Sequence, residues 1–368
     1  MSSKVYFTDF RVRFGDTLPK KLQRLMKQAG FEEIDFKDKF VAIKIHFGEL
    51  GNLAYLRPNY ARAVADYVKE RGGRPFLTDC NTLYVGSRKD GLVHMETAYL
   101  NGFTPYTTGC HVIIADGIKG TNETLVPIDC EYVKEARIGS AIMDADIVIS
   151  LSHVKGHEQA GFGGALKNLG MGSGSRAGKM QQHCDGKPVV DPSRCIGCGA
   201  CARICAHDGP QIKNGKCTID MDKCVGCGRC IGVCARDAIE PAWDGTAHGL
   251  NCRIAEYAYA VCKDRPNFHI ALICDVSPNC DCHSENDVPI IPDVGMLASF
   301  DPVALDCAAA DLCLAQPVNR GSVLEECISN GAEGDHFHAV HPNTYWQYCV
   351  EHGEKIGLGS REYELIKL

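Results

Sequence analysis

The chain of 368 residues is 45% hydrophobic and 8% aromatic, enough apolar material for one large domain or two ordinary ones. Its net charge of −7, its pI near 6.1 and the lack of a basic block argue against a nucleic-acid partner, because phosphates require clustered Lys and Arg. No stretch resembles a signal peptide or approaches the roughly 18 apolar residues of a membrane span. We therefore expect a cytoplasmic protein without a membrane partner, acting with a small-molecule substrate or a redox partner protein.

Short apolar strands alternate with amphipathic helices along most of the chain. We expect strands at 40–46, 74–79, 111–115, 146–152 and 268–274. We expect helices at 17–29, 58–72, 135–144, 250–263 and 302–315. This alternation predicts an α/β fold in which a mostly parallel sheet is covered by helices on both faces.

Polar side chains follow the predicted strands and form a candidate catalytic set: His46, Glu49, Asp79, His153, Lys155 and His157. Open α/β sheets bind ligands outside the carboxyl ends of their strands, so we expect these groups to converge on one edge. In "SHVKGH" an extended backbone would point the two histidines and the lysine the same way. The ordinary alternative for any one of them is a strand-end residue that meets solvent.

The glycine-rich segment 161–180, "GFGGALKNLGMGSGSRAGKM", is not a P-loop, because no glycine lies five residues before Gly178 and Met180 replaces the Ser or Thr that would hold magnesium. We expect Lys167 and Asn168 to lie on a short helix whose glycine-rich flanks approach a ligand closely. A plain linker is the alternative.

Two segments of the chain repeat each other: "VVDPSRCIGCGACARIC" (189–205) and "TIDMDKCVGCGRCIGVC" (218–234). Each has the spacing C-x2-C-x2-C-x3-C, in which three thiolates wrap one cluster and the fourth reaches across to the other. The expected ligands of two [4Fe–4S] clusters are Cys195, Cys198, Cys201, Cys205, Cys224, Cys227, Cys230 and Cys234. Zinc sites usually show two C-x2-C pairs joined by a longer loop, so this doubled pattern argues against zinc.

The repeat resembles the bacterial two-cluster ferredoxins over residues 187–243, with Ala206 and Ala235 where that family usually has proline. We therefore expect an inserted α+β ferredoxin-like domain at 188–243, between the two parts of the α/β domain at 1–187 and 244–368. The 22 cysteines indicate metal or cluster ligation in a reducing compartment, and they favour an anaerobic or microaerobic host.

A further group of thiols, Cys274, Cys280 and Cys282, lies in "CDVSPNCDC" after the last predicted strand. Three thiolates could hold a third [4Fe–4S] cluster with one iron left open for chemistry. A mononuclear zinc or iron site and unligated packing thiols remain as alternatives.

The stretches "KIHFGELGN", "TDCNTLYVGSR", "SHVKGHEQAGFGGALKNLGMG", "CDC" and "DVGMLASFDPVALD" resemble the domain-of-unknown-function 362 family, in the subgroup with an inserted two-cluster ferredoxin. The resemblance implies an iron–sulfur protein, found mostly in anaerobes, of unsettled activity. We expect an iron–sulfur oxidoreductase in which the ferredoxin segment relays electrons to a site at the strand ends. The alternatives are an electron carrier or adaptor without its own catalysis, and non-redox chemistry, such as sulfur transfer or dehydration, at an open-iron third cluster.

Overall fold

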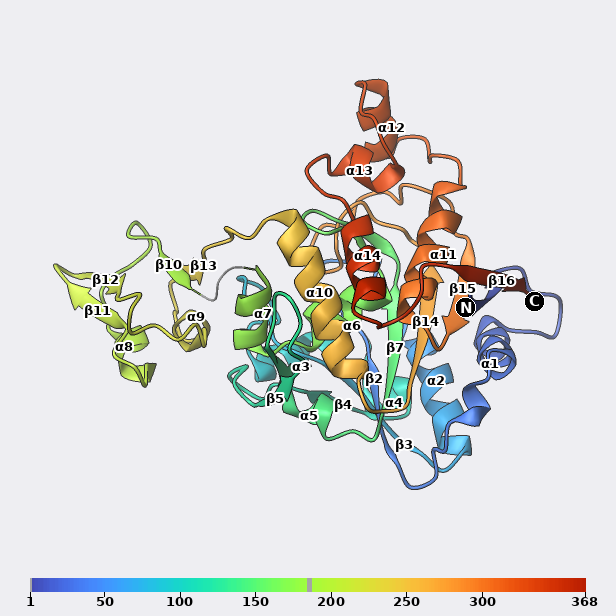
Figure 1. The fold of residues 1–368 in the computed structure, drawn as a ribbon, viewed down its shortest axis with the longest axis horizontal. Coiled ribbons are helices and arrows are strands. Elements are labelled where there is room, and N and C mark those ends of the chain that lie inside the picture. Colours follow the sequence, from blue (N-terminus) through green and yellow to red (C-terminus); the bar gives the residue numbers. More distant parts are fainter. Residues whose placement is uncertain (1, 184–186) are drawn as a thin grey trace.

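A large sheet organises the computed structural model, which describes residues 2–183 and 187–368 (Figure 1). Its strands, in spatial order, are β16 (Tyr363–Lys367), β1 (Ser3–Asp9), β15 (Gly295–Ser299), β14 (Asn267–Ile273), β7 (Ile147–His153), β2 (Phe40–Lys44), β3 (Arg74–Asp79) and β4 (His111–Ile114). The five strands from β14 to β4 pair in parallel, and β15 runs antiparallel to both of its neighbours. The expected α/β fold with a mostly parallel sheet is confirmed.

Helices cover both faces of the sheet. On one face, α1 (Leu18–Gln28), α2 (Pro58–Glu70) and α3 (Gly91–Leu100) share an apolar core with side chains of β2, β7 and β14. On the other face, α6 (Ala165–Ser173), α10 (Ala247–Cys262), α11 (Pro302–Leu314) and α14 (Gln347–Lys355) form a second core. Alternate residues of each strand enter opposite cores, because successive side chains of a strand point to opposite faces.

Further helices and strands outside residues 188–243 complete the sheet domain. They are η1 (Phe31–Glu33), α4 (Pro105–Thr108), β5 (Glu123–Pro127), β6 (Glu135–Gly139), α5 (Ser140–Met143), β8 (Lys155–His157), β9 (Gly161–Gly163), α7 (Arg176–His183), α12 (Val323–Ser329) and α13 (His336–Val340). Among the described residues, every helix is too short or too polar to cross a lipid bilayer.

One of the ten expected elements is wrong. The helix predicted at 135–144 is instead strand β6 followed by the single turn α5. β6 pairs along its whole length with β5 in an antiparallel ribbon, and Ala136 and Ile138 enter the core. Strand pairing outweighs the weak helical preference of this short segment.

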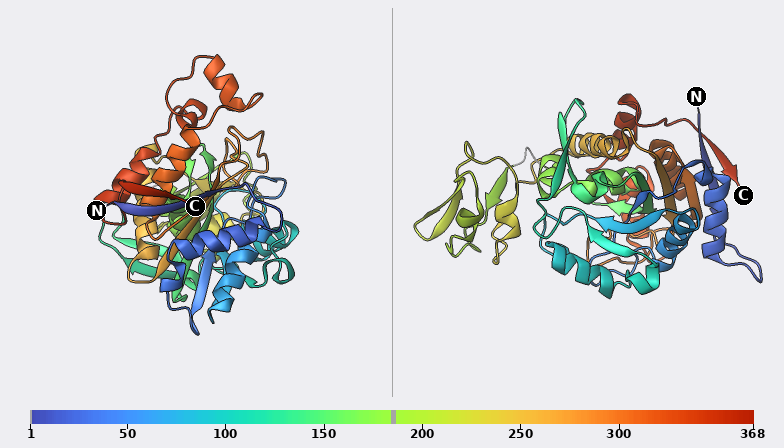
Figure 2. Two further views of the ribbon diagram at one scale, coloured as in Figure 1. Left: turned by 90° about the vertical axis from the view of Figure 1, so that its right-hand side faces the viewer. Right: turned by 90° about the horizontal axis from the view of Figure 1, so that it is seen from below.

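Residues 188–243 interrupt the crossover between the parallel strands β7 and β14. Their elements are β10 (Pro188–Val190), α8 (Ala200–Ile204), β11 (Pro210–Lys213), β12 (Lys216–Ile219), α9 (Arg229–Gly232) and β13 (Ile239–Pro241). β10 pairs with β13 at the two ends of the segment, so it leaves and re-enters the sheet domain at one place. Figure 2 shows it extending away from the sheet domain, at the end opposite to the chain termini. We call this segment the insertion.

Candidate functional site

A cavity of about 470 Å³ opens beyond the carboxyl ends of β2 and β3. Helices α6 and α7 and the loops that follow β3, β7 and β14 form its walls. The expected catalytic residues that line it are His46, Glu49, Asp79, Lys155, His157 and Lys167. The parallel sheet therefore brings residues more than 100 positions apart in the chain to one site.

Buried ion pairs form one wall of the cavity. Asp79 lies 2.9 Å from the Lys44 ammonium and 3.5 Å from the Arg88 guanidinium, and Arg88 also bonds Glu49 at 3.1 Å. Burial alone would raise the pKa of Asp79, but the charges of Lys44 and its other neighbours hold it well below the usual value. This carboxyl is therefore ionised and paired. Lys44 and Arg88 were not predicted, although a lysine inside the apolar strand "FVAIKIH" is a usable signal.

His46 lies beside this wall. Its Nδ1 accepts the backbone N–H of Gly48 at 3.0 Å, and burial lowers the pKa of the ring well below 6.5. The imidazole is therefore neutral, with its proton on Nε2. In this form His46 can donate a hydrogen bond through Nε2.

His153 does not line the cavity, contrary to the expectation that it faces substrate. Its Nδ1 lies 2.9 Å from the carboxylate of Asp281, and its Nε2 lies 2.8 Å from the carbonyl oxygen of Cys274. Lys155 bonds the same carboxylate at 3.1 Å and is also buried. Asp281, which was not predicted, therefore anchors the loop after β14 to the segment after β7.

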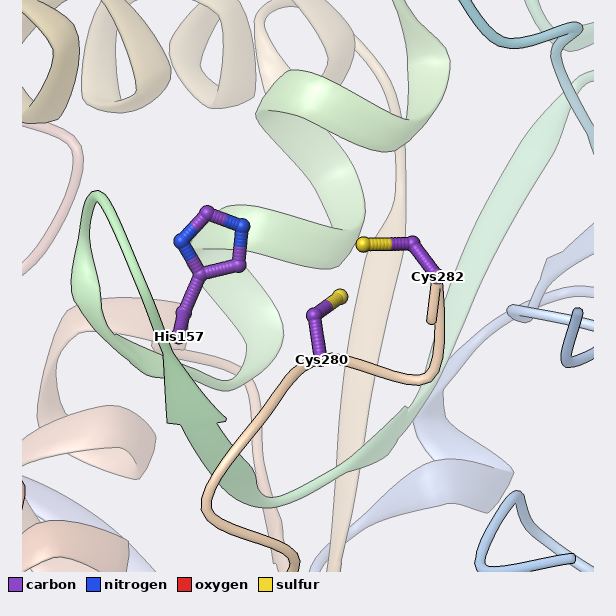
Figure 3. A group of neighbouring side chains, drawn as sticks. All are labelled: His157, Cys280 and Cys282. Atoms are coloured by element: carbon purple, nitrogen blue, oxygen red, sulfur yellow. The ribbon is translucent and has the colours of Figure 1, made fainter. Parts of the chain in front are cut away.

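Figure 3 shows the side chains of Cys280 and Cys282, the two cysteines that flank Asp281 in the sequence, together with the ring of His157. The sulfurs of Cys280 and Cys282 and a ring nitrogen of His157 all lie within 4.8 Å of one another. A second group, which shares Cys282, contains Glu158 and His283. Both groups contain side chains of types that could hold a metal ion. The "CDC" sequence thus places its carboxylate inside the protein, the thiol of Cys282 at the cavity and the thiol of Cys280 in the interior beside Lys167.

Cys274 is separated from the other two thiols, which corrects the expected three-cysteine group. Its side chain enters the core beneath α1 and α2, and it lines a different small cavity with Tyr60 and Arg57. Cys280, by contrast, contacts Lys167 of α6, on the opposite face of the sheet. The period-two alternation of β14 continues through Cys274 and directs it to the wrong face for a shared cluster.

Two small cavities in the insertion are lined by cysteines. One is lined by Cys195, Cys198 and Cys201 of the first repeat together with Cys234 of the second. The other is lined by Cys224, Cys227 and Cys230 of the second repeat together with Cys205 of the first. The fourth cysteine of each repeat thus crosses to the other cavity. Cys217, which the motif does not include, is buried with its sulfur 3.5 Å from that of Cys201.

The insertion borders the large cavity directly. His183, at the end of α7, and Trp243, just after β13, line the cavity, and their rings meet edge to face at 4.8 Å. Leu83 lines the cavity and also belongs to the apolar cluster that contains Cys195, Cys201 and Cys230. The cavity therefore lies at the junction of the two modules.

The fold and these groups define a cysteine-rich α/β protein with sets of side chains that could hold metal ions. The family model of DUF362, a domain of unknown function, matches residues 41–311. Because this is most of the chain, the protein belongs to the DUF362 family.

More distant similarities are limited. The chain is 31% identical over 131 residues to a thylakoid-associated protein of Synechocystis sp., and the match spans 36% of this chain and 36% of that protein. The lactate racemase apoprotein of Thermoanaerobacterium thermosaccharolyticum aligns with 72% of this chain and 52% of its own, at 12% identity and a TM-score of 0.39. A Thermotoga maritima protein aligns with 92% of this chain and 58% of its own, at 9% identity and a TM-score of 0.35. Nothing about the activity of this chain follows from these similarities.

Proposed function

We propose that this DUF362 protein is an iron–sulfur oxidoreductase, in which the insertion is a ferredoxin-like electron-transfer module and the large cavity is the site of reduction. The observation that carries the proposal is the crossed arrangement of cysteines in the two small cavities. Each cavity presents three thiols of one repeat and one of the other, which is the ligand pattern of two-cluster ferredoxins.

The donor set fits two [4Fe–4S] clusters. Four thiols of the repeats line each cavity; Cys217 also lines the first cavity and His207 the second, but both lie outside the repeated motif. Gly197, Gly199, Gly226 and Gly228 all have positive φ, so the backbone curls around the cysteines as the spacing requires. Bound there, such clusters would supply one-electron transfer.

The cavity is built to act on a small molecule rather than only to dock a partner. Its volume lies in the range of ordinary ligand sites, and its walls combine apolar side chains with neutral and charged groups. Lys167 and Lys155 supply positive charge beside the thiols, and His46 supplies an N–H. These groups can orient a substrate and hold protons during a reduction.

The proposal includes a reducing, cytoplasmic setting and an external redox partner that supplies electrons. The large number of thiols supports such a setting, because they would form disulfides or oxidise elsewhere. A third cluster is not part of the proposal, because Cys274 is directed to the opposite face of the sheet from Lys167 and Cys280.

Two matched double variants test the cysteine assignment after anaerobic reconstitution. The wild type should bind about eight irons per chain and show the EPR signals of reduced [4Fe–4S] clusters. Cys198→Ser/Cys234→Ser removes two ligands of one cavity and should retain about four irons, with one cluster signal intact. Cys198→Ser/Cys205→Ser removes one ligand from each cavity and should perturb both signals. Equal effects of the two double variants would refute the crossed assignment.

An electron carrier without catalysis is the alternative that these variants do not address. A carrier needs no cavity chemistry, so His46→Ala and Lys167→Ala would leave electron transfer to any acceptor unchanged. If the protein is an oxidoreductase, His46→Ala and Lys167→Ala should keep both EPR signals but should no longer reduce a substrate bound in the cavity.

A further inference from the structure

Cys280 and Cys282 form a close pair of thiols at the edge of the large cavity. They are separated by one residue, and their sulfurs lie within 4.8 Å and point toward each other (Figure 3). Cys282 lines the cavity, whereas Cys280 is only 1% exposed. One thiol is therefore reachable from the cavity and the other lies directly behind it.

Lys167 and Lys155 place positive charge near the buried member of the pair, and the charge of Glu158 partly opposes it. The ammonium of Lys167 lies 3.2 Å from the sulfur of Cys280. A hydrogen bond from Cys282, together with the charges of Lys167 and Lys155, lowers the pKa of Cys280 to about 5, and the same hydrogen bond raises the pKa of Cys282. The pair therefore holds one proton near neutral pH, on Cys282, and one thiolate, on Cys280.

The orientation of His157 favours thiol chemistry over metal binding at this pair. Its Nδ1 accepts the backbone N–H groups of Gln159 and Ala160 at 3.1 and 2.9 Å. A neutral imidazole that accepts at Nδ1 carries its proton on Nε2. Burial lowers the pKa of this ring well below 6.5, so the ring is neutral. The nitrogen left to face the sulfurs thus presents an N–H, whereas a metal would need its lone pair.

Asp281 holds the pair in place. Its carboxylate is fixed from behind by His153 and Lys155, and its carbonyl oxygen accepts the backbone N–H of Glu49 at 2.9 Å. A C-x-C pair held in this way has few conformations to lose when a disulfide closes between its two sulfurs.

We propose that Cys280 and Cys282 are a redox-active dithiol that reduces a small disulfide bound in the large cavity. This inference rests on the proposed function, which makes the insertion the source of the electrons that restore the dithiol. It assigns the substrate class of that same site.

The chemistry balances in two half-reactions. In the first, Cys282 gives its proton to the Cys280 thiolate and attacks one sulfur of the substrate, which breaks the substrate S–S bond and releases one thiolate. Cys280 then attacks the mixed disulfide, its proton passes to a departing thiolate, and the second half of the substrate leaves. The products are the Cys280–Cys282 disulfide, one thiol and one thiolate. In the second, two electrons and one proton from an external one-electron donor restore one thiol and one thiolate.

The first half-reaction can be tested without electron transfer. Reduced, reconstituted protein is mixed anaerobically with bis(2-hydroxyethyl) disulfide, quenched with an alkylating agent and mapped by mass spectrometry. The wild type should release two thiols per chain and acquire a Cys280–Cys282 disulfide. Cys280→Ser should stop at a mixed disulfide on Cys282, whereas Cys282→Ser should slow adduct formation by at least about 100-fold. Cys274→Ser is the matched control and should behave as the wild type does.

Three results would overturn the dithiol: adducts formed equally in both single variants, substrate reduction without the intramolecular disulfide, or one zinc or iron per chain that is lost in Cys280→Ser and Cys282→Ser. Iron content and circular dichroism of each variant show that it is folded and loaded. The second half-reaction, followed as recovery of the dithiol with reduced viologen, tests the proposed function separately. The first half-reaction could occur while the dithiol recovers as fast in Cys198→Ser/Cys205→Ser as in the wild type. That result would support the redox-active dithiol and refute the insertion as its source of electrons.

Discussion

Asp281 shows how one buried charge can organise a site that it does not enter. Its carboxylate is fully buried and meets His153 at 2.9 Å and Lys155 at 3.1 Å. Paired in this way, it stays ionised in the protein interior, because its partners hold its pKa well below the usual value against the opposing effect of burial. With Asp281 held in this way, Cys282 lines the cavity and Cys280 lies buried beside Lys167.

Asp281→Asn should destabilise the protein by about 3–5 kcal/mol, because it leaves the Lys155 charge buried without its partner. Chemical denaturation under anaerobic conditions measures the change. Asp275→Asn is the matched control from the same loop: Asp275 is partly exposed and lies 3.9 Å from Arg57, so its loss should cost less than about 1 kcal/mol. Similar effects of the two substitutions would show that Asp281 is not an anchor.

Lys167→Met should raise the pH at which the thiolate of the Cys280–Cys282 pair forms by about 1–3 units, because the charge beside the sulfur is lost. The thiolate absorbance and the pH dependence of alkylation report this midpoint. Lys179→Met provides a comparison within the same cavity, since Lys179 bonds the carbonyl oxygens of Gly172 and Gly174 instead of a sulfur. An unchanged midpoint in Lys167→Met would contradict the assigned role.

Helix α6 carries Lys167 into the cavity, and two features fix its position. The carboxyl oxygens of Asp306, on α11, accept the backbone N–H groups of Ala165 and Leu166 at 2.6 and 2.9 Å, which caps the first turn of α6. Gly170 packs directly against the backbone of α10, where a Cβ would collide with the carbonyl oxygen of Ile254. The helix is thus held both at its start and along its side.

Asp306 makes the stability of the protein depend on pH. Burial raises the pKa of its carboxyl from 3.8 to about 7. The folded state therefore retains a proton that the unfolded chain has already lost, and stability falls as pH rises through 7. Between pH 5 and 7 the loss should be about 1.4 kcal/mol per pH unit. The asparagine side chain in Asp306→Asn cannot ionise, so the free energy of unfolding of the variant lacks this pH dependence. The free energy of unfolding of the wild type should therefore fall relative to that of the variant from pH 5 to pH 8. A constant difference in urea unfolding across this range would be inconsistent with the raised pKa.

The molecule as a whole consists of a sheet domain and an insertion that meet at a small apolar joint. Leu83 and Met180 of the sheet domain join the apolar cluster of the insertion. Lys89 forms an ion pair with Asp237, and Arg176 packs its side chain against α9. This contact between the two modules is small, whereas the sheet domain has two apolar cores of its own. We therefore expect the sheet domain to fold without the insertion.

Replacement of residues 188–243 by a short Gly/Ser linker should leave a folded sheet domain that binds none of the eight irons expected of the insertion. The termini of the deleted segment lie side by side in the β10–β13 pair, so a short linker can span them. Hydrogen exchange should find the amides of β7 and β14 still protected, with new exposure around Leu83 and Met180. Unprotected β7 and β14 would mean that the insertion is required for the sheet.

Several features could be predicted because they depend on residues close together in the chain. The apolar strands at 40–46 and 74–79 and the helices at 250–263 and 302–315 correspond to β2, β3, α10 and α11. The segment at 135–144 could not be assigned correctly, because its partner β5 lies in another part of the chain and the pairing decides its structure. The polar residues at the ends of the predicted strands likewise identified His46, Asp79 and His157 as cavity residues. The same pattern wrongly placed His153 in the cavity, whereas its side chain bonds the buried Asp281.

Spacing within the sequence was sufficient to identify the repeated cysteine motifs and the alternation of strands and helices, because thiol spacing and hydrophobic periodicity act over a few residues. The partners of Asp281, the approach of Lys167 to Cys280 and the separation of Cys274 from Cys282 depended on the tertiary structure. Each of these joins or divides segments more than 100 residues apart, or depends on which face of the sheet a side chain enters. These contacts form only when the strands pair in their native register and the two cores pack. A shift of one residue in a strand would move every side chain of that strand to the opposite face of the sheet.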